Sequence, residues 1–587
     1  MDMIKLEING IPVEVPAGTT ILKAAEAVQV KIPRLCYHPD LRAWAACGIC
    51  IVKVAGSPKM LRACCTEVAN GMKVITHDPE IVAVRRTVLE LILSAHPNDC
   101  LQCARSGHCE LQTLASDFGI RETPYQRRVA EIPKDCSTPS LVLDPWKCIK
   151  CGRCVSVCQN MQNVWALEFI NRGEQTRIAP AADCSLAESP CIKCGQCSAH
   201  CPVGAIYENN ETPKVWNALK DQEKYCVVQI APAVRVAVGE AFGFEPGTLQ
   251  TGKIYAALRR MGFKAVFDTN WSADLTIMEE GSEFVQRFTK AKGAGPLPLI
   301  TSCCPAWTDW MEKYASDFTE NFSSAKSPQQ MLSALAKTYW AEKNGVDAKS
   351  VHVTSIMPCT AKKFEILRCK TMSATGQQDT DVVLTTRELA RMIKSAGIDF
   401  ADLPEEPADE LLGAYTGAAT IFGVTGGVME AALRTAYCLI TKKDAPPSIN
   451  FEAVRGMDGV KEAEIDIDGI KVKIAVAHQM GNVEAVLNNI REDIKAGKKP
   501  RYDFIEVMAC RGGCIGGGGQ PCLATDEIRA QRTAGIYTDD ERSTIRMSHL
   551  NPQVTALYKD YLGEPCGHKS HELLHTHYGT REVYKKS

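Results

Sequence analysis

Two cysteine runs in residues 148–201 constrain the fold more than any other feature of the chain. Both have the spacing C-x2-C-x2-C-x3-C; the first contains Cys148, Cys151, Cys154 and Cys158, and the second contains Cys191, Cys194, Cys197 and Cys201. Tandem runs of this kind hold paired [4Fe-4S] clusters, and the fourth cysteine of each run ligates the other cluster. Two zinc sites are the alternative, since C-x2-C pairs also bind zinc. We therefore expect one cluster on Cys148, Cys151, Cys154 and Cys201, and the other on Cys191, Cys194, Cys197 and Cys158.

Cysteine is the outlying residue type of the whole chain, with 28 among 587 residues and 19 of these within residues 1–226. Disulfide frameworks belong to short secreted chains that carry a signal peptide. This chain is long, and residues 1–8 alternate charged and apolar side chains instead of forming a basic segment and then an apolar one. We therefore expect a cytoplasmic protein whose thiols are reduced metal ligands.

The overall composition is that of an ordinary soluble protein, with 45% hydrophobic and 23% charged residues and a formal net charge of -2. Such a chain has no basic field that would bind nucleic acid. The longest uncharged stretch, Leu411–Met429, is long enough to cross a membrane, but its five glycines and three threonines favour a packed core segment. Neither nucleic acid nor a membrane is an expected partner, and the length predicts about three to five domains.

The local patterns indicate mixed α and β structure. Alternating apolar residues on either side of Asn9-Gly10 predict a β-hairpin, and Thr19 or Thr20 is a suitable cap for the helix that follows. Beyond residue 225, strand-like runs such as 226–230 and 471–477 alternate with helical stretches. This alternation predicts a large α/β domain.

A third cysteine group follows the hairpin. Its spacing resembles the [2Fe-2S] ferredoxin arrangement, with a first gap longer than that of the plant type, and its members are Cys36, Cys47, Cys50 and Cys64. Cys65 lies beside Cys64 and makes the fourth ligand ambiguous. The Arg-Ala-Cys pattern of the family with this [2Fe-2S] arrangement favours Cys64 as the fourth ligand.

A fourth group combines one histidine with three cysteines, His96, Cys100, Cys103 and Cys109. It resembles the [4Fe-4S] site with one histidine and three cysteine ligands in iron-sulfur subunits through which electrons enter larger enzymes. A neutral imidazole in place of a thiolate leaves the cluster less negative, which raises its potential.

Three later segments carry the strongest signatures. They are TSCCPAW at 301–307, MPCTAKKFE at 357–365 and FIEVMACRGGCIGGGGQP at 504–521. They resemble the three signatures of the [FeFe]-hydrogenases, and the upstream cluster motifs occur in the same order in the large clostridial-type members of that family. The resemblance covers essentially the whole chain. It implies an iron hydrogenase that catalyses the reversible reaction of two protons and two electrons to H2.

The resemblance also implies the ligands of the active-site H-cluster, a [4Fe-4S] cube joined through one cysteine to a two-iron unit with CO, cyanide and dithiolate ligands. These ligands are Cys304, Cys359, Cys510 and Cys514, with Cys514 as the bridge. The glycines around Cys514 fit this role, because glycine backbone approaches a bulky cofactor closely. A flexible loop is the alternative interpretation.

Further residues are implied to hold the two-iron unit. Lys362 matches the hydrogen-bond partner of a cyanide, a charged and therefore strong donor. The backbone around Ala231-Pro232 and Ser327-Pro328 lies nearby, and an apolar wall is formed by Met357, Met508 and Phe422. Taken alone, the two methionines are typical of core packing.

The chemistry also needs a path for protons. By resemblance, Cys303 faces the two-iron unit and begins a relay that continues through water, Glu280, Ser323, Glu283 and Arg287. The two glutamates and Arg287 share one helix face, since they are three and four residues apart. Without the resemblance, that pattern is typical of a solvated charged face.

Together these motifs predict four domains. We expect a β-grasp [2Fe-2S] ferredoxin-like domain at 1–79, a small helical domain with the histidine-ligated [4Fe-4S] cluster at 80–136, a two-[4Fe-4S] bacterial ferredoxin-like domain at 137–212, and a large α/β H-cluster domain of two lobes with a C-terminal tail at 213–587. The expected cofactors are one [2Fe-2S] cluster, three accessory [4Fe-4S] clusters and the H-cluster.

No flavin or dinucleotide motif is found in the sequence, so a partner must exchange electrons with the protein. The tail at 570–578 resembles the catalytic subunits of multimeric NAD(P)-linked, electron-bifurcating hydrogenases. It implies a flavin- and NAD(P)-binding diaphorase subunit, a small [2Fe-2S] subunit and ferredoxin as partners. The rival function is a non-catalytic iron-sulfur subunit of an NADH dehydrogenase-like complex, which residues 1–210 also resemble but which lacks the three signatures.

Other motifs are weaker. Gly247-x4-Gly252-Lys253 lacks the hydroxyl residue of a phosphate-binding loop, because Ile254 follows. The His571-Glu-Leu-Leu-His575 sequence resembles a zinc-protease motif but has no room for a third ligand downstream. Seven further cysteines lack ligand spacing and are expected to pack as small apolar groups: Cys136, Cys184, Cys226, Cys369, Cys438, Cys522 and Cys566.

Overall fold

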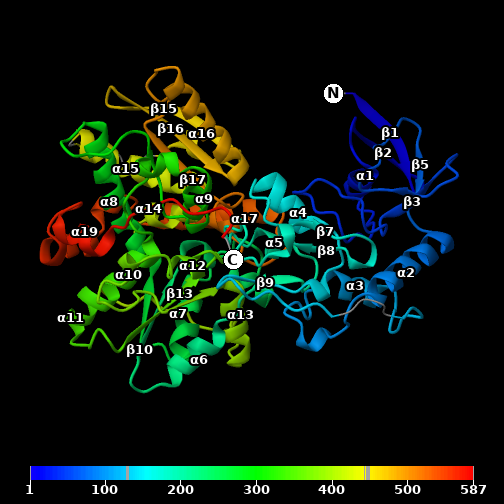
Figure 1. The fold of residues 1–587 in the computed structure, drawn as a ribbon, viewed down its shortest axis with the longest axis horizontal. Coiled ribbons are helices and arrows are strands. Elements are labelled where there is room, and N and C mark those ends of the chain that lie inside the picture. Colours follow the sequence, from blue (N-terminus) through cyan, green and yellow to red (C-terminus); the bar gives the residue numbers. More distant parts are fainter. Residues whose placement is uncertain (1, 127–130, 442, 444–449, 586–587) are drawn as a thin grey trace.

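The computed structural model describes residues 2–126, 131–441, 443 and 450–585. The N-terminal sheet lies at one end of the molecule and the two four-stranded sheets of the C-terminal part lie at the other, with the two cysteine runs of residues 148–201 between them (Figure 1). The order of these parts in space therefore follows their order in the chain.

The N-terminal part is a five-stranded sheet with one helix. The strand order is β2-β1-β5-β3-β4, with β1 (Met3–Ile8), β2 (Ile11–Pro16), β3 (Ile51–Val54), β4 (Leu61–Arg62) and β5 (Lys73–Ile75). Asn9 and Gly10 adopt φ values of 53° and 82° in the β1–β2 turn, which confirms the predicted hairpin. The Thr20 side chain accepts the Lys23 N–H at the start of α1 (Ile21–Ala27), which confirms the predicted cap.

The next part contains short elements that frame the cysteine loops. Helices α2 (Pro79–Ser94) and α3 (Glu110–Asp117) flank the loop of residues 96–109, and two small antiparallel pairs follow, β6 (Leu141–Leu143) with β9 (Ile206–Glu208) and β7 (Glu168–Ile170) with β8 (Arg177–Ala179). Each cysteine run turns at a glycine of positive φ into a short helix, Gly152 into α4 (Arg153–Ser156) and Gly195 into α5 (Gln196–His200). The two runs are thus a matched pair of loops.

The large C-terminal part contains two four-stranded sheets. The first is wholly parallel, in the order β11-β10-β13-β14, with β10 (Tyr225–Ile230), β11 (Ala265–Asp268), β13 (Val351–Met357) and β14 (Val382–Thr385). The second has the order β12-β17-β16-β15 and is parallel except for the β15–β16 pair, with β12 (Leu299–Ile300), β15 (Val460–Ile467), β16 (Ile470–His478) and β17 (Phe504–Met508). The strands predicted at 226–230 and 471–477 are therefore β10 and β16.

Helices surround both sheets, and one of them belongs to both cores. They are α6 (Thr212–Lys220), α7 (Thr251–Arg260), α8 (Thr269–Phe288), α9 (Pro305–Tyr314), α10 (Pro328–Leu335), α11 (Ala341–Asn344), α12 (Lys362–Glu365), α13 (Thr386–Ser395), α14 (Gly417–Thr420), α15 (Gly427–Thr441), α16 (Met480–Lys495), α17 (Asp526–Arg542), α18 (Pro552–Leu557) and α19 (His568–Leu574). In α8, Trp271 and Leu275 pack into the core of the first sheet, whereas Ile277 and Phe284 pack into that of the second. Helix α8 therefore lies between the two lobes, each of which is one four-stranded sheet with its surrounding helices.

The uncharged stretch at 411–429 is a core segment, as predicted. It contains α14 and the start of α15, and Ala418, Ile421 and Phe422 are buried in the core of the second sheet. Among the described residues, no helix is both long and apolar enough to span a membrane.

Candidate active site and metal centres

Four cysteines from three distant segments meet where the two sheets of the C-terminal part face each other. Cys304 follows β12 and precedes α9, Cys359 follows β13, and Cys510 and Cys514 follow β17. Each segment leaves the carboxyl end of a parallel strand, which is where open α/β sheets place their ligands. The two lobes thus bring together residues that are up to 210 positions apart.

These cysteines line a small cavity of about 90 Å³. The cavity is also lined by most of the residues that the sequence predicted around the two-iron unit: Ala231, Pro232, Cys303, Met357, Lys362, Phe422 and Met508. Of the predicted pair Ser327-Pro328, Pro328 lines the cavity and Ser327 does not; the Ser327 hydroxyl instead donates to Glu365 at 3.0 Å.

The electrostatics of the cavity suit a metal cluster. Burial and then the neighbouring Cys304 raise the pKa of Cys359 to about 12, and the same causes raise the pKa of Cys514 to about 12. Four thiols so close together therefore lose their protons only when positively charged metal ions take the place of those protons. The thiols present fit an iron-sulfur cluster.

Lys362 is the charged group of this cavity. Its ammonium donates to the Cys303 carbonyl oxygen at 3.1 Å and to both carboxylate oxygens of Glu365, at 3.1 Å and 2.9 Å. Burial alone lowers the pKa of Lys362, but the Glu365 carboxylate outweighs burial and raises it above its usual value. Lys362 therefore stays charged and fixed in position. The sequence reasoning missed Glu365; its place three residues after Lys362 was the available signal.

Two glycines are required by close packing at the third signature. Gly513 has a φ of 93°, and a Cβ there would lie 2.6 Å from the Thr425 nitrogen and 2.8 Å from Met508 Sδ. At Gly518 a Cβ would lie 2.2 Å from the Cys194 carbonyl oxygen. The glycine-rich stretch is therefore tightly packed, and the alternative of a flexible loop is wrong.

The residues of the predicted proton relay lie next to one another along α8. Glu280 is 1% exposed and lies beside the Ser323 hydroxyl; burial raises its pKa to about 8. Ser323 Oγ donates to Glu283 Oε2 at 3.2 Å, and Arg287 Nη2 donates to Glu283 Oε1 at 2.6 Å. Cys303 is partly buried and close enough to Glu280 for that carboxylate to raise the pKa of its thiol, after burial as the main cause. The alternative of a solvated charged face is wrong, because Glu280 and Arg287 are buried.

The eight cysteines of the tandem runs form two separate sets. One small cavity is lined by Cys148, Cys151, Cys154 and Cys201, and another by Cys158, Cys191, Cys194 and Cys197. Burial and then Cys201 raise the pKa of Cys148 to about 11. The fourth cysteine of each run thus joins the other set, which is the exchange that the spacing predicts.

The inner of these two sets lies against the catalytic cysteines. Cys194 is among the thiols that raise the pKa of Cys510, after burial as the main cause. Thr360 Oγ1 donates to the Lys193 carbonyl oxygen at 2.7 Å, and Gln196 Nε2 donates to the Gly516 carbonyl oxygen at 2.9 Å. These bonds hold the two cysteine sets side by side.

The N-terminal group also converges. Cys36 contacts Cys47 and Cys64, and Cys64 contacts Cys50. The neighbouring Cys65 is exposed, and its thiol lies 3.7 Å from the Arg62 carbonyl oxygen. The geometry therefore favours Cys64 over Cys65 as the fourth member of the set.

The loop between α2 and α3 brings three of its four predicted ligands together. Burial raises the pKa of Cys109, and the nearby Cys103 and Cys100 raise it further. His96 lies two residues after α2, and its Nδ1 accepts the Asn98 N–H at 3.4 Å. The place of His96 in this set stays a prediction.

Comparison with known protein families identifies the C-terminal part. A family described as "Iron only hydrogenase large subunit, C-terminal domain" matches residues 224–518, and one described as "Iron hydrogenase small subunit" matches residues 526–581. The chain belongs to the [FeFe]-hydrogenases. Upstream, a [2Fe-2S] cluster-binding domain matches residues 1–79, an NADH-ubiquinone oxidoreductase-G iron-sulfur binding region matches residues 85–124, and a [4Fe-4S] dicluster domain matches residues 147–205. The protein is an iron hydrogenase with accessory iron-sulfur domains.

Individual relatives agree with this family. The chain is 48% identical to "NADP-reducing hydrogenase subunit HndD" of Solidesulfovibrio fructosivorans, over 99% of this chain and 100% of the relative. It is 39% identical to "Iron hydrogenase 1" of Clostridium pasteurianum, over 97% of this chain and 99% of the relative. A solved structure of apo [FeFe]-hydrogenase HydA1 from Chlamydomonas reinhardtii is similar at a TM-score of 0.56 and 42% identity, over 64% of this chain and 100% of that one.

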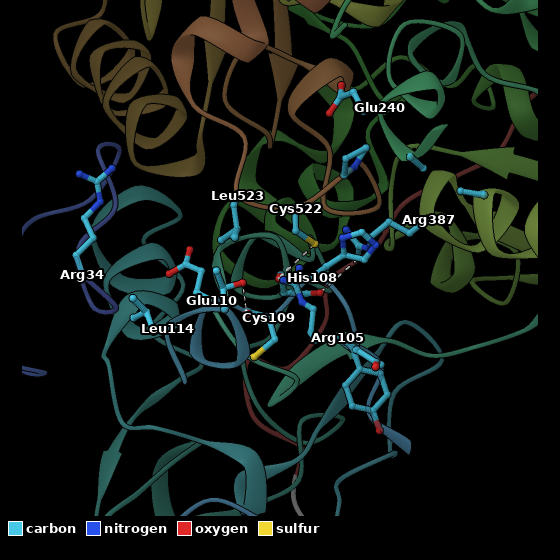
Figure 2. A pocket seen from close by; sticks show the side chains of 18 of the residues that line it. Arg34, Arg105, His108, Cys109, Glu110, Leu114, Glu240, Arg387, Cys522 and Leu523 are labelled. Atoms are coloured by element: carbon cyan, nitrogen blue, oxygen red, sulfur yellow. Dashed lines mark hydrogen bonds between the residues drawn. The ribbon is translucent and has the colours of Figure 1, made fainter. Parts of the chain in front are cut away.

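This hydrogenase has a second, larger cavity of about 910 Å³, which none of the four catalytic cysteines lines. It is lined by the N-terminal domain, the Cys100–Cys109 loop and the C-terminal part; in Figure 2, Arg34 and Arg387 stand on different sides, with Cys109 and Glu110 between them. Arg34 is paired with Glu26, and Arg387 with Glu208 at 2.6 Å. No sequence pattern predicted this cavity, because its walls come from segments hundreds of residues apart.

The expectation for the remaining cysteines of the hydrogenase is partly wrong. Cys226 is buried in an apolar core, as expected, although its thiol also donates to the Ala218 carbonyl oxygen at 3.2 Å. Cys136 is exposed, Cys369 Sγ lies 2.9 Å from the Thr371 hydroxyl, and Cys566 Sγ donates to the Glu279 carbonyl oxygen at 3.4 Å. A thiol is a weak hydrogen-bond donor as well as an apolar group, and spacing alone does not tell which of the two a fold uses.

Proposed function

We propose that Cys304, Cys359, Cys510 and Cys514 hold the H-cluster of this hydrogenase, with Cys514 as the bridge. One observation carries the proposal: four free thiols from three segments line one cavity together with a charged lysine. When bound, the H-cluster supplies the metal centre at which H2 is formed or split. The rest of the chemistry belongs to the chain, which binds the cluster, excludes water and moves protons.

In this proposal the apolar lining and Lys362 have separate tasks. Met357, Met508 and Phe422 exclude water from the cavity, which strengthens every electrostatic interaction inside it. The Lys362 ammonium would donate to an anionic ligand of the two-iron unit, and Glu365 holds the ammonium in position. Ala231 and Pro232 complete the wall at the end of β10.

Protons move between Cys303 and the outside through Glu280, Ser323 and Glu283. Because the pKa of Glu280 is about 8, this carboxyl group carries a proton at neutral pH and is able to donate it. Its Oε2 has no hydrogen-bond partner among the described residues, which leaves room for the water expected between it and Cys303. Arg287 holds Glu283 in place at the outer end.

Electrons travel through the accessory clusters, from a β-grasp [2Fe-2S] domain at 1–79 and a histidine-ligated domain at 80–136, through the dicluster domain at 137–212, to the catalytic domain at 213–587. The contacts between the Cys194 loop and the Cys510–Cys514 segment support the last step. The predicted ligand Cys109 lines the 910 Å³ cavity, which makes that region a suitable place for electrons to enter.

The electrons are exchanged with NAD(P)-linked partner subunits, a flavin-containing diaphorase and a small [2Fe-2S] protein, and with ferredoxin. The relative named as an NADP-reducing hydrogenase subunit, which matches over its full length, supports this. None of the 28 cysteines forms a disulfide bond, which suits the reducing cytoplasm.

Two measurements test the proposal. Infrared spectra of the correctly matured protein are expected to show bands of metal-bound CO and cyanide, with H2 production from a viologen donor. If both the infrared bands and H2 production were absent, the rival function of a non-catalytic iron-sulfur subunit would be accepted instead. Purification of the native complex is expected to yield a flavoprotein subunit; a chain that purifies alone and reacts with ferredoxin only would contradict the NAD(P) link.

A further inference from the structure

On its outer side the proposed relay ends at Arg287, whose guanidinium is unable to pass a proton on. Arg287 is 7% exposed, and its guanidinium donates to the carbonyl oxygens of Pro296, Glu320 and Phe322 as well as to Glu283. A guanidinium does not lose its proton in proteins, since its pKa lies above about 12. Arg287 therefore positions Glu283, and the proton that Glu283 receives or gives needs another neighbour.

The other carboxylate oxygen of Glu283 has such a neighbour. Glu283 Oε2 accepts from the Ser324 N–H at 3.1 Å and from the Ser324 hydroxyl at 3.4 Å. The Ser324 hydroxyl is also 2.8 Å from Nδ1 of His575, and Nε2 of His575 is 3.0 Å from Glu279 Oε2. A continuous chain of hydrogen bonds thus leads from the relay to a histidine of the C-terminal segment.

The fold fixes this histidine firmly. Residues 574–576 run antiparallel to 324–326, with backbone bonds from Lys326 N to Leu574 O at 2.7 Å and from Thr576 N to Ser324 O at 2.8 Å. The groups that titrate or carry charge around His575 are Glu279 and Glu283 on α8, Tyr558 and Cys566 after α18, and His571 on α19. Burial alone raises the pKa of Glu279, but its bonds to His575 and Tyr558 outweigh burial and lower it, so Glu279 is a carboxylate beside the imidazole.

A bound metal does not explain this cluster. Glu279, Cys566 and His575 lie close enough to share an ion. However, both oxygens of Glu279 already accept hydrogen bonds, from Tyr558 and from the Cys566 N–H, and both ring nitrogens of His575 are engaged. The ligand atoms are therefore satisfied by protein groups, which is the arrangement of a proton-exchanging network.

We infer that His575 is a further proton-relay residue of this hydrogenase, which stores a proton at the outer end of the path and exchanges it with Glu283 through the Ser324 hydroxyl. The inference rests on the relay given under Proposed function. In the inward direction, Nδ1–H of the imidazolium donates its proton to Ser324 Oγ while the Ser324 proton passes to the Glu283 carboxylate. One proton leaves His575 and one arrives on Glu283; Ser324 is unchanged and no electron moves.

The geometry explains why this position holds a histidine. An imidazole suits this position because it presents two ring nitrogens, of which Nδ1 lies 2.8 Å from the Ser324 hydroxyl and Nε2 lies 3.0 Å from Glu279 Oε2. His571 is exposed and its ring centroid lies 4.1 Å from that of His575, so the C-terminal segment brings the stored proton close to the surface.

The test compares His575→Gln, Glu283→Gln and His577→Gln in the matured full chain. Gln at 575 hydrogen-bonds but does not store a proton, so H2 production from a viologen donor is expected to fall by about tenfold or more, with an altered pH profile and an unchanged iron content. In Glu283→Gln, H2 production is expected to fall at least as far. His577→Gln, at an exposed ring two residues beyond His575, serves as the matched control and is expected to keep the wild-type rate.

A second readout does not depend on turnover. In protein that lacks the two-iron unit and carries 13C-labelled histidine, infrared titration is expected to show one protonated-ring signal that is missing in His575→Gln. In Glu283→Gln this signal should disappear at a lower pH than in wild type, because a carboxylate that favours the imidazolium has been removed. If His575→Gln does not fold, Glu279→Gln is the replacement variant: the protonated-ring signal should again disappear at a lower pH, because this variant also removes a carboxylate beside the imidazole.

The outcomes separate the role of His575 from the relay on which it rests. Wild-type turnover and pH profile in His575→Gln, with Glu283→Gln inactive, would overturn the role of His575 and leave the relay in place. Wild-type turnover in Glu283→Gln would overturn the relay itself, and the inference with it. A titration signal that is unchanged in Glu283→Gln would also overturn the inference, since it would show that the two groups do not interact.

Discussion

The tandem cysteine runs and the catalytic cysteines are both sets of buried or partly buried cysteines, but they are built in different ways. Within residues 148–201, each set takes three thiols from one short loop and the fourth from its twin. The catalytic set takes its four thiols from segments that follow β12, β13 and β17, which belong to two different sheets. The first kind of site is largely local, and the second exists only after two lobes have docked.

This difference predicts how each region responds to change. Metal binding by a local loop is coupled to the folding of that loop alone. The catalytic site depends on the registration of both lobes, on α8 between them and on close glycine contacts with the Cys194 loop. Substitutions near the catalytic cysteines should therefore abolish activity while the accessory clusters remain.

The largest effect is expected for Cys514→Ser. A hydroxyl does not replace a thiolate that bridges the cube and the two-iron unit, so all H2 activity and the CO and cyanide infrared bands should vanish. Electron paramagnetic resonance of the reduced protein should still show the accessory clusters. Cys226→Ser is the matched control at a buried cysteine, with an effect on stability of about 1 kcal/mol and normal spectra. Loss of the accessory signals in Cys514→Ser would show that the two regions do not assemble independently.

Cys303→Ser tests the same site without removing a proposed ligand. All clusters should form, but turnover should fall by orders of magnitude, because a hydroxyl exchanges protons far less readily than a thiol and each ~1.36 kcal/mol added to the barrier costs a factor of ten. Rates of H2 production and iron content measured on one preparation decide this. Near-normal turnover at full iron content contradicts the proton-relay role.

The pH dependence should report on Glu280. Its pKa of about 8 lies above the ordinary value, so the carboxyl group is protonated below that pH and loses its proton as the pH rises through it. H2 production limited by proton delivery should therefore fall to roughly half at pH 8 and to about a tenth at pH 9. A rate that stays constant from pH 6 to 9 in the viologen assay would mean that Glu280 does not limit delivery.

Gly518→Ala probes the contact between the two regions. A Cβ at this position would lie 2.2 Å from the Cys194 carbonyl oxygen, so the backbone must move, at a cost of about 1–3 kcal/mol. Thermal unfolding should occur at a lower temperature, with slower viologen-dependent H2 production. Gly579→Ala is the control, because a Cβ there would have no atom of the described residues within 4 Å. Equal stability of the two variants would contradict the close contact.

The smallest effect is expected at Cys65. Its exposed thiol lies outside the contacts that join Cys36, Cys47, Cys50 and Cys64. Cys65→Ser should keep the visible spectrum of the [2Fe-2S] cluster, whereas Cys64→Ser should lose or change it. The opposite result would make Cys65 the fourth ligand.

Much of the architecture was predictable because it is encoded locally. The β1–β2 hairpin follows from Asn9-Gly10, the cap of α1 from Thr20, and the two thiol sets of residues 148–201 from their spacing. The three catalytic segments were found through a family resemblance, since no local spacing connects Cys304 with Cys359 or Cys510. Sequence reasoning also misjudged Cys136, Cys369 and Cys566, whose surroundings are set by distant parts of the chain.

The sequence by itself determined which side chains are available and which of them must meet within a single loop, because a few residues of chain permit only a few conformations. Only the tertiary structure decided which distant groups become neighbours: Lys362 beside the Cys303 carbonyl oxygen, the Cys194 loop beside Cys510, and His575 beside Ser324 and Glu279. These contacts join residues that lie far apart in the chain. They depend on how two lobes and a terminal segment pack around α8, and packing is a property of the whole core.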